Sequence, residues 1–215
     1  MSGRQEVAAF FLAPFVWTAD ELLGPERVDT LLAEQGLTRA QTADRDGWLT
    51  LAVCEGFCEA LNREIDDPTF FERCGRAALS AKAMGMMLPL FRGVGSPAFG
   101  YQQAARGLSR FNKVGTMEIQ DERPGYLRLT YQPAPGAPRE SSPLICVTRR
   151  SQLATFPTLF GLPPATIDHL TCLHEGGECC SYEIHYQPGG ERRLGLGVSI
   201  CLLYTSPSPR DGTKY

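Results

Sequence analysis

The sequence lacks a long apolar run. Its main apolar stretch near the start, Ala8–Trp17, has ten residues, which is too short to cross a bilayer. It is also not typical of a signal peptide, because Glu6 precedes it, Asp20 and Glu21 follow it, and no small-residue cleavage pattern appears. We therefore expect no membrane segment in this part of the protein.

The sequence also lacks an excess of basic charge. It has 21 Lys and Arg residues against 24 Asp and Glu residues, a net charge of −3, so we expect no direct binding to nucleic acid. Eight cysteines in 215 residues do not resemble the disulfide framework of a small secreted domain. A reducing cytoplasm is the better expectation.

Catalytic motifs are missing as well. The chain contains no Gly-rich phosphate loop, no His-Glu-x-x-His and no nucleophile elbow. Gly93-Val94-Gly95 lacks the further glycine and the strand–turn–helix setting of a dinucleotide fingerprint. We expect no enzymatic activity in this segment.

The order of predicted elements indicates an α+β protein, with an N-terminal helical half followed by an antiparallel sheet of two hairpins with an intervening helix. We expect one domain over residues 1–200, helical over 8–112 and hairpin-rich over 115–190. The predicted helices are 8–23, 25–35, 46–65, 68–80, 82–91, 97–112 and 151–160, and the predicted strands are 116–121, 126–132, 166–174 and 179–187. The apolar run 143–150 is ambiguous between helix and strand.

The second hairpin has the strongest local signal. Gly176-Gly177 separates two β-prone runs, and glycine adopts the positive φ that tight hairpin turns need. Alternation then places five side chains on one buried face, namely Leu170, Cys172, Cys180, Tyr182 and Ile184.

Cys172 and Cys180 lie opposite each other in this register. They form either a small packed pair, since free cysteine is often buried, or half of a metal site. We favour the packed pair, because two more ligands at a fixed spacing are not visible. A fourth ligand would have to come from a distant helix, for example Cys54, Cys58 or Glu55, while Cys74 and Cys146 are expected to be core residues.

Cys172-x3-Gly176-x3-Cys180 resembles the end of the bacterial vinyl-reductase-type small-molecule-binding domain, which is related to haem–nitric-oxide-binding domains and to aromatic-sensing domains of enhancer-binding activators. Arg149–His169 resembles the segment before that hairpin in N-terminal sensory domains of histidine kinases and cyclases. Pro97–Pro133, with the helix end Gly107–Phe111, resembles the ligand-binding domain of some AraC-type regulators.

The resemblance implies an apolar cavity between helices and sheet. Candidate residues for binding a small apolar or aromatic effector are Met84, Met87, Phe91, Phe99, Tyr101 and Phe111. A Met-Leu-Phe stripe at helical spacing is also typical of plain core, and this alternative stays open.

The resemblance also bears on cofactors. It makes zinc at Cys172 and Cys180 possible. Haem-binding relatives use a histidine on a helix, whereas His169, His174 and His185 lie on no strong helical pattern and the Tyr-x-Ser-x-Arg motif of those relatives is absent. We therefore expect haem to be unlikely and no cofactor to be needed.

The function that follows is an N-terminal input domain of a bacterial signalling or regulatory protein, which forms a homodimer and has lost its output domain. Cys201–Tyr215 resembles translated sequencing adaptor, so the natural chain is expected to be cut near Ile200. Two alternatives remain: a vinyl reductase or accessory enzyme of tetrapyrrole metabolism, and a module that only dimerises.

Overall fold

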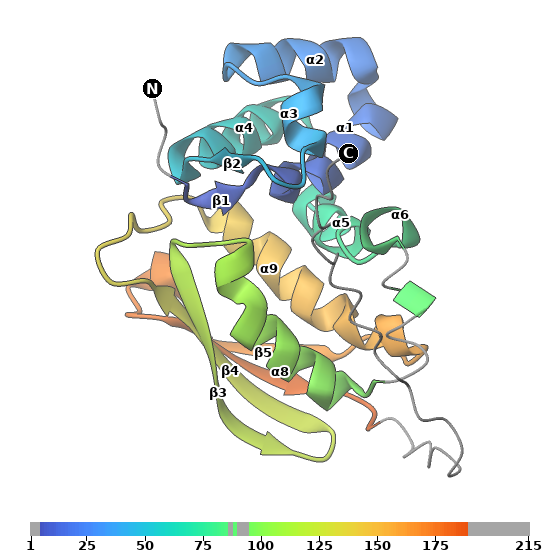
Figure 1. Cartoon of the computed structure of the whole chain (residues 1–215), viewed down its shortest axis with the longest axis vertical. Helices are drawn as coiled ribbons and strands as arrows, with labels where there is room; N and C mark the ends of the chain where they lie inside the picture. Colours follow the sequence, from blue (N-terminus) through green and yellow to red (C-terminus); the bar gives the residue numbers. More distant parts are fainter. Residues whose placement is uncertain (1–4, 86–87, 90–94, 189–215) are drawn as a thin grey trace, which may run out of the picture.

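The computed structural model describes residues 5–85, 88–89 and 95–188. A group of helices lies over one end of an antiparallel sheet, and one long helix, α9, runs between them (Figure 1). The predicted α+β class is confirmed. Cys201–Tyr215 lies outside the described residues. Within those residues no helix combines the length and the apolar character that crossing a membrane requires.

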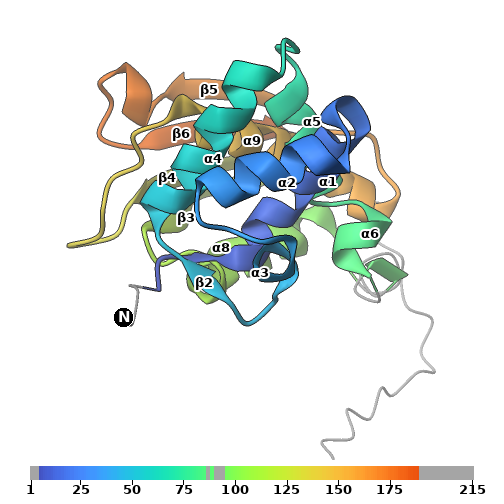
Figure 2. The same cartoon turned by 90° about the horizontal axis from the view of Figure 1, so that it is seen from above.

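The helical half begins with η1 (Ala9–Leu12) and α1 (Ala13–Leu23), and Figure 2 shows it from above. Its further helices are α2 (Pro25–Glu34), α3 (Arg39–Ala43), α4 (Leu51–Glu64), α5 (Phe70–Ala77) and α6 (Ala81–Met84). Pro25 opens α2 directly after Gly24, as predicted from the fixed φ of proline.

The helix predicted from Asp46 starts later than expected. The Thr38 side chain accepts from the Gln41 backbone in a capping box that starts α3, a helix the sequence had not suggested. The Thr50 side chain accepts from the Val53 backbone and so caps α4 at residue 51. Between these caps the chain forms β2 (Trp48–Leu49), which pairs with β1 (Val7–Ala8).

The main sheet has four antiparallel strands in the order β3-β4-β6-β5. β3 (Gly115–Arg123) and β4 (Tyr126–Pro133) form the first predicted hairpin, turning at Gly125 with φ of 77°. β5 (Thr166–Thr171) and β6 (Cys180–His185) form the second, joined through η4 (Leu173–Glu175). The strands of this second hairpin are therefore shorter than predicted.

The predicted buried face of the second hairpin is correct at four positions and wrong at one. Cys172, Cys180, Tyr182 and Ile184 are buried, whereas Leu170 is 51% exposed. A bulge between His169 and Thr171 breaks the two-residue alternation. As a result His169 packs against Tyr182 in place of Leu170.

Two helices cover the sheet. α8 (Pro97–Gly107) starts at the predicted Ser96 cap and ends in η2 (Leu108–Arg110). α9 (Pro143–Thr155) continues into η3 (Phe156–Phe160), so the ambiguous run 143–150 is helical. Ser142 caps α9 through its side chain, and Pro143 occupies the first turn.

α9 also contacts the helical half closely. A Cβ at Gly75 of α5 would lie 2.5 Å from the Thr148 carbonyl oxygen and 2.6 Å from Ser151 Cβ, so only glycine permits this approach. Glu55 of α4 accepts hydrogen bonds from the backbone N–H groups of Ser141 and Ser142 at 2.6 and 3.0 Å. The start and the middle of α9 are therefore held by the helices above it.

The buried apolar side chains form two clusters. One lies among the helices and is centred on fully buried residues of α1, α2, α4 and α5. The other lies between the sheet, α8 and α9, and contains Tyr101, Leu127, Leu129 and Tyr182.

Candidate metal centre and ligand cavity

Three cysteines meet where α9 crosses the second hairpin. Cys146 Sγ lies 3.9 Å from Cys172 Sγ and 3.8 Å from Cys180 Sγ. All three are buried, and none is in a disulfide. α9 supplies Cys146 one turn after its Ser142 cap, and the hairpin supplies the other two.

A histidine completes the group. The His169 ring stacks on Tyr182 with centroids 4.6 Å apart and an interplanar angle of 21°. Its Nε2 atom is buried and has no hydrogen-bond partner within the described structure. A buried imidazole nitrogen without a partner is unfavourable unless another group binds it.

The ligand atoms of Cys146, His169, Cys172 and Cys180 all lie within 4.8 Å of one another. A tetrahedral zinc ion with Zn–S bonds of about 2.3 Å would place its sulfur atoms about 3.8 Å apart. The distances from Cys146 Sγ to the other two sulfur atoms, 3.9 and 3.8 Å, match this spacing. Three cysteines and one histidine are also a common ligand set of structural zinc.

This group corrects the expectation about a fourth ligand. Cys54 and Cys58 belong to the helical cluster, and Glu55 binds Ser141 and Ser142. Burial raises the pKa of both thiols, to about 12 for Cys54 and well above its ordinary value for Cys58. The side chains that the structure places beside Cys172 and Cys180 are instead Cys146 and His169, and the spacing His169-x2-Cys172 was the available signal.

The thiols of the group are not equivalent. The hydrogen bond with Cys146 and the backbone N–H of Leu173 lower the pKa of Cys180, although burial opposes this. The same hydrogen bond and burial raise the pKa of Cys146 above its ordinary value. One sulfur of this buried pair is therefore favoured as a thiolate, which is the form that binds metal.

A separate apolar cavity of about 410 Å³ lies between the helical half and the sheet. Its walls come from both: Phe10, Phe11, Pro14 and Leu51 on the helical side, and Met117, Tyr131, Ile145 and Leu153 on the other. Ala104, Gly107 and Leu108 line it from α8. This volume is within the usual range of small-molecule sites.

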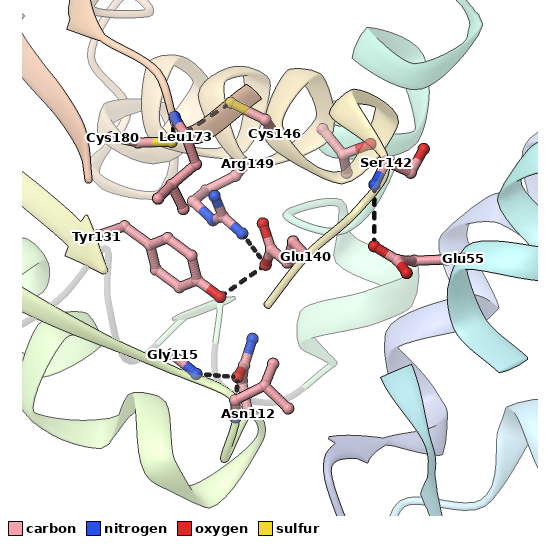
Figure 3. A network of polar contacts seen from close by, with 12 residues as sticks. Glu55, Asn112, Gly115, Tyr131, Glu140, Ser142, Cys146, Arg149, Leu173 and Cys180 are labelled. Atoms are coloured by element: carbon pink, nitrogen blue, oxygen red, sulfur yellow. Dashed lines mark hydrogen bonds and ion pairs between the residues drawn. The ribbon is translucent and has the colours of Figure 1, made fainter. Parts of the chain in front are cut away.

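One wall of the cavity holds a buried polar group made of Tyr131, Glu140 and Arg149 (Figure 3). The Tyr131 hydroxyl donates to Glu140 Oε1 at 2.6 Å, and Arg149 Nη2 donates to the same oxygen. The Arg149 guanidinium carbon lies 3.4 Å from the centroid of the Tyr131 ring. Burial opposes the charge of Arg149, but the attraction of Glu140 raises its pKa. Burial also raises the pKa of Tyr131.

The residues predicted to bind an effector lie at different places. Phe111 lines the cavity although it is 63% exposed. Tyr101 is fully buried and donates to the Leu153 carbonyl at 2.7 Å, and Phe99 is 52% exposed. Met84 lies half-buried at the end of α6. Met87 and Phe91 lie outside the described residues. Among the predicted residues, the cavity lining thus contains Phe111.

Sequence reasoning missed Tyr131, Glu140 and Arg149. The composition of Pro133–Ser142 predicts a loop, and the structure places Glu140 of this loop against β4 and α9. The isolated acidic residue gave no signal because its partners are separated from it by nine residues in each direction.

Comparison of the sequence with protein-family models and with curated proteins finds no match. Solved structures of H-NOX proteins are similar in fold. The Fe(II) unliganded H-NOX protein from K. algicida is 12% identical, with a TM-score of 0.59 over 84% of this chain and 96% of that one. The S. oneidensis H-NOX protein in the Fe(II)NO state is 12% identical, with a TM-score of 0.61 over 83% and 98%.

An oxygen-binding H-NOX domain related to soluble guanylate cyclases is 8% identical, with a TM-score of 0.61 over 83% of this chain and 94% of that one. At these identities the likeness establishes the fold. It supports the haem–nitric-oxide-binding side of the resemblance drawn from the sequence, and not the vinyl-reductase side.

These neighbours contradict the expectation that haem is unlikely and that no cofactor is needed. Solved proteins of this fold are described by their Fe(II) state and by the distortion and redox potential of their heme. In this chain no histidine or cysteine is among the described residues that line the cavity. The iron-ligating atom types that do line it are the Tyr131 phenol and the Met117 thioether. The residues present therefore do not fit a histidine-ligated haem.

Proposed function

We propose that this chain is a small-molecule sensory domain of a signalling protein, which binds an apolar effector in the cavity and passes the signal to an output domain. The observation that carries the proposal is that the cavity is walled by both halves of the molecule. A ligand held there contacts α1 and α4 on one side and α9 on the other. Its binding can therefore favour one arrangement of the two halves over another.

Binding of naphthalene tests the proposal, because this probe is apolar and carries no head group. Ala104 lines the cavity from α8 at an exposed position, so Ala104→Phe adds a ring at the opening of the cavity. Arg106 is exposed on the same helix and is not among the lining residues, so Arg106→Phe is the matched control. Equilibrium dialysis should show binding to the wild-type chain and to Arg106→Phe, with at least a tenfold loss in Ala104→Phe.

Equal binding by Ala104→Phe and the wild-type chain would mean that the probe occupies another place. A wild-type chain that binds neither naphthalene nor its hydroxylated analogue 2-naphthol would overturn the proposal itself.

A second proposal concerns the metal centre: Cys146, His169, Cys172 and Cys180 hold one zinc ion. Four protein ligands leave no open position, so the zinc has a structural role. The zinc ion joins α9 to the second hairpin. Without the ion, these two elements are held together by packing. The carrying observation is the mutual distance of the four ligand atoms.

Elemental analysis of protein purified without added metal tests the zinc proposal. We expect about one zinc per chain in the wild-type protein and in Cys54→Ser, which changes a buried thiol of the helical cluster. Cys146→Ser should contain much less. If wild-type protein purified under reducing conditions contains no zinc, the zinc proposal is wrong and the cysteines form a packed group without metal.

Haem is a further candidate for the cavity, in view of the solved proteins of this fold. Haem, if bound, would supply an iron that binds a diatomic gas. In this chain Tyr131 and Met117 are the lining residues with atoms that ligate iron, and Arg149 supplies a buried positive charge beside them. No step through the iron follows from these residues alone.

A further inference from the structure

The polar group on the cavity wall has unused hydrogen-bonding atoms. Arg149 Nη1 and Glu140 Oε2 are buried, and neither has a hydrogen-bond partner among the described residues. The side chains of Arg149 and Glu140 are 7% and 2% exposed. A buried donor or acceptor left unpaired destabilises the fold. A functional reason for keeping both atoms is therefore expected.

The charges of this group are balanced. Arg149 and Glu140 form an ion pair, and Tyr131 donates a hydrogen bond to the shared Glu140 oxygen. A further charge buried beside a neutral pair would itself lack compensation. Arg45 also lines the cavity, but it is exposed and lies over the Phe10 ring, 4.3 Å from its centroid. Water screens its charge more strongly than that of Arg149.

We propose that the cavity selects an apolar molecule with one uncharged head group that both accepts and donates a hydrogen bond, such as a phenol, an alcohol or an amide. The head group accepts from Arg149 and donates to Glu140, while the apolar body fills the remaining cavity. The inference rests on the proposed function, because it names the class of effector that the same cavity takes. It gives the buried ion pair a role in recognition.

Three probes of similar size distinguish a cavity that selects a neutral head group from a cavity that binds any apolar effector. Naphthalene has no head group, 2-naphthol has a neutral donor and acceptor, and 2-naphthoate has a charged acceptor. Equilibrium dialysis at pH 7 should show that 2-naphthol binds the wild-type chain about tenfold more tightly than either other probe. Tenfold corresponds to about 1.4 kcal/mol, which the two hydrogen bonds of the head group can supply.

Glu140→Gln provides a sharper test, because it removes the negative charge and keeps the shape of the side chain. Arg149 then becomes a buried cation without a counter-ion, so the preference should change to 2-naphthoate. Glu59→Gln is the matched control. Glu59 accepts from the Ser142 hydroxyl at 2.5 Å, outside the cavity, and its variant should keep the wild-type order of affinities.

The outcomes are distinct. Naphthalene that binds the wild-type chain as tightly as 2-naphthol overturns the inference and leaves the proposed function intact. So does 2-naphthoate as the tightest wild-type ligand, which would indicate a site for anions. Binding of none of the three overturns both proposals. If Glu140→Gln fails to fold, as judged by circular dichroism, the wild-type order of the three probes still decides.

Discussion

The sulfur atoms of Cys146 and Cys180 lie 3.8 Å apart, although 34 residues separate them in the sequence. One belongs to α9 and the other to β6, so this contact is one of several that join the helix to the sheet. Its chemistry decides how firmly the two elements are held. A pair of thiols contributes packing, whereas two ligands of one metal ion contribute a cross-link.

The first prediction concerns removal of the metal. Stripping zinc with a chelator should lower the melting temperature of the wild-type chain by about 5–10 °C, since a ligand at 100 times its dissociation constant contributes about 2.7 kcal/mol and each kcal/mol corresponds to about 2–4 °C at this chain length. Cys146→Ser should show no such response to the chelator. Calorimetry of both proteins with and without chelator makes the measurement, and equal responses would place the zinc elsewhere.

The second prediction concerns the register of β5 and β6. Tyr182 is fully buried, so Tyr182→Ala should lower the free energy of unfolding by about 3–5 kcal/mol. Leu170→Ala, on the exposed side of the bulge, should change it by less than about 0.5 kcal/mol. Denaturant titrations of the two variants check this. A large loss for Leu170→Ala would mean that the bulge is misplaced.

The third prediction concerns acid stability. Hydrogen bonds from the Thr69 hydroxyl and backbone N–H lower the pKa of Asp67, with a smaller contribution from Arg73. A lowered pKa in the folded state stabilises the fold above the ordinary pKa of aspartate, and this stabilisation is lost as the pH falls through the folded value. Asp67→Asn should therefore be less stable than the wild-type chain at pH 7, and the gap should narrow toward pH 3.

Denaturant midpoints at several pH values measure this gap. Asp66→Asn makes the same change of charge one residue earlier and serves as the control. A gap between wild type and Asp67→Asn that stays constant from pH 7 to pH 3 would contradict the assignment to Asp67.

The fourth prediction concerns haem. If the chain takes up added haemin into the cavity, its absorption spectrum should not change in His169→Ala, His174→Ala or His185→Ala, because these histidines do not line the cavity. Tyr131→Phe or Met117→Leu should change the spectrum, because these residues carry the ligating atoms there. A spectrum that depends on one of the histidines would place the haem outside this cavity.

The sequence was informative where one local signal was enough. Pro25 and the turn at Gly125 determine element boundaries through backbone geometry, and Ser96 does so through its side-chain cap. The elements predicted to begin at residues 25, 97 and 126 accordingly begin there. The α+β class followed from the same signals. The short pair β1–β2 was missed because two residues on each strand carry no periodicity.

The site was harder to predict from the sequence, because its residues on α9 lie together only if the segment is recognised as a helix. Ser142, Cys146, Arg149 and Leu153 follow at intervals of four, three and four residues, which places them along one face of the helix. The run 143–150 was ambiguous between helix and strand, so this face could not be recognised. Cys146 was correctly predicted as a core residue, but its closeness to Cys172 and Cys180 was not recognised, and Arg149 received no role in the site.

The close contact of α5 with α9 at Gly75 couples a movement of α9 to the helical half of the molecule. With no Cβ between them, α5 and α9 are in backbone contact, so a tilt of one helix displaces the other by a similar amount. α5 in turn packs on α1, where the rings of Phe71 and Phe15 lie 6.1 Å apart. We therefore expect a conformational change at the cavity to reach the outer surface of the helical half. A neighbouring domain that responds to this change would need to dock on that surface.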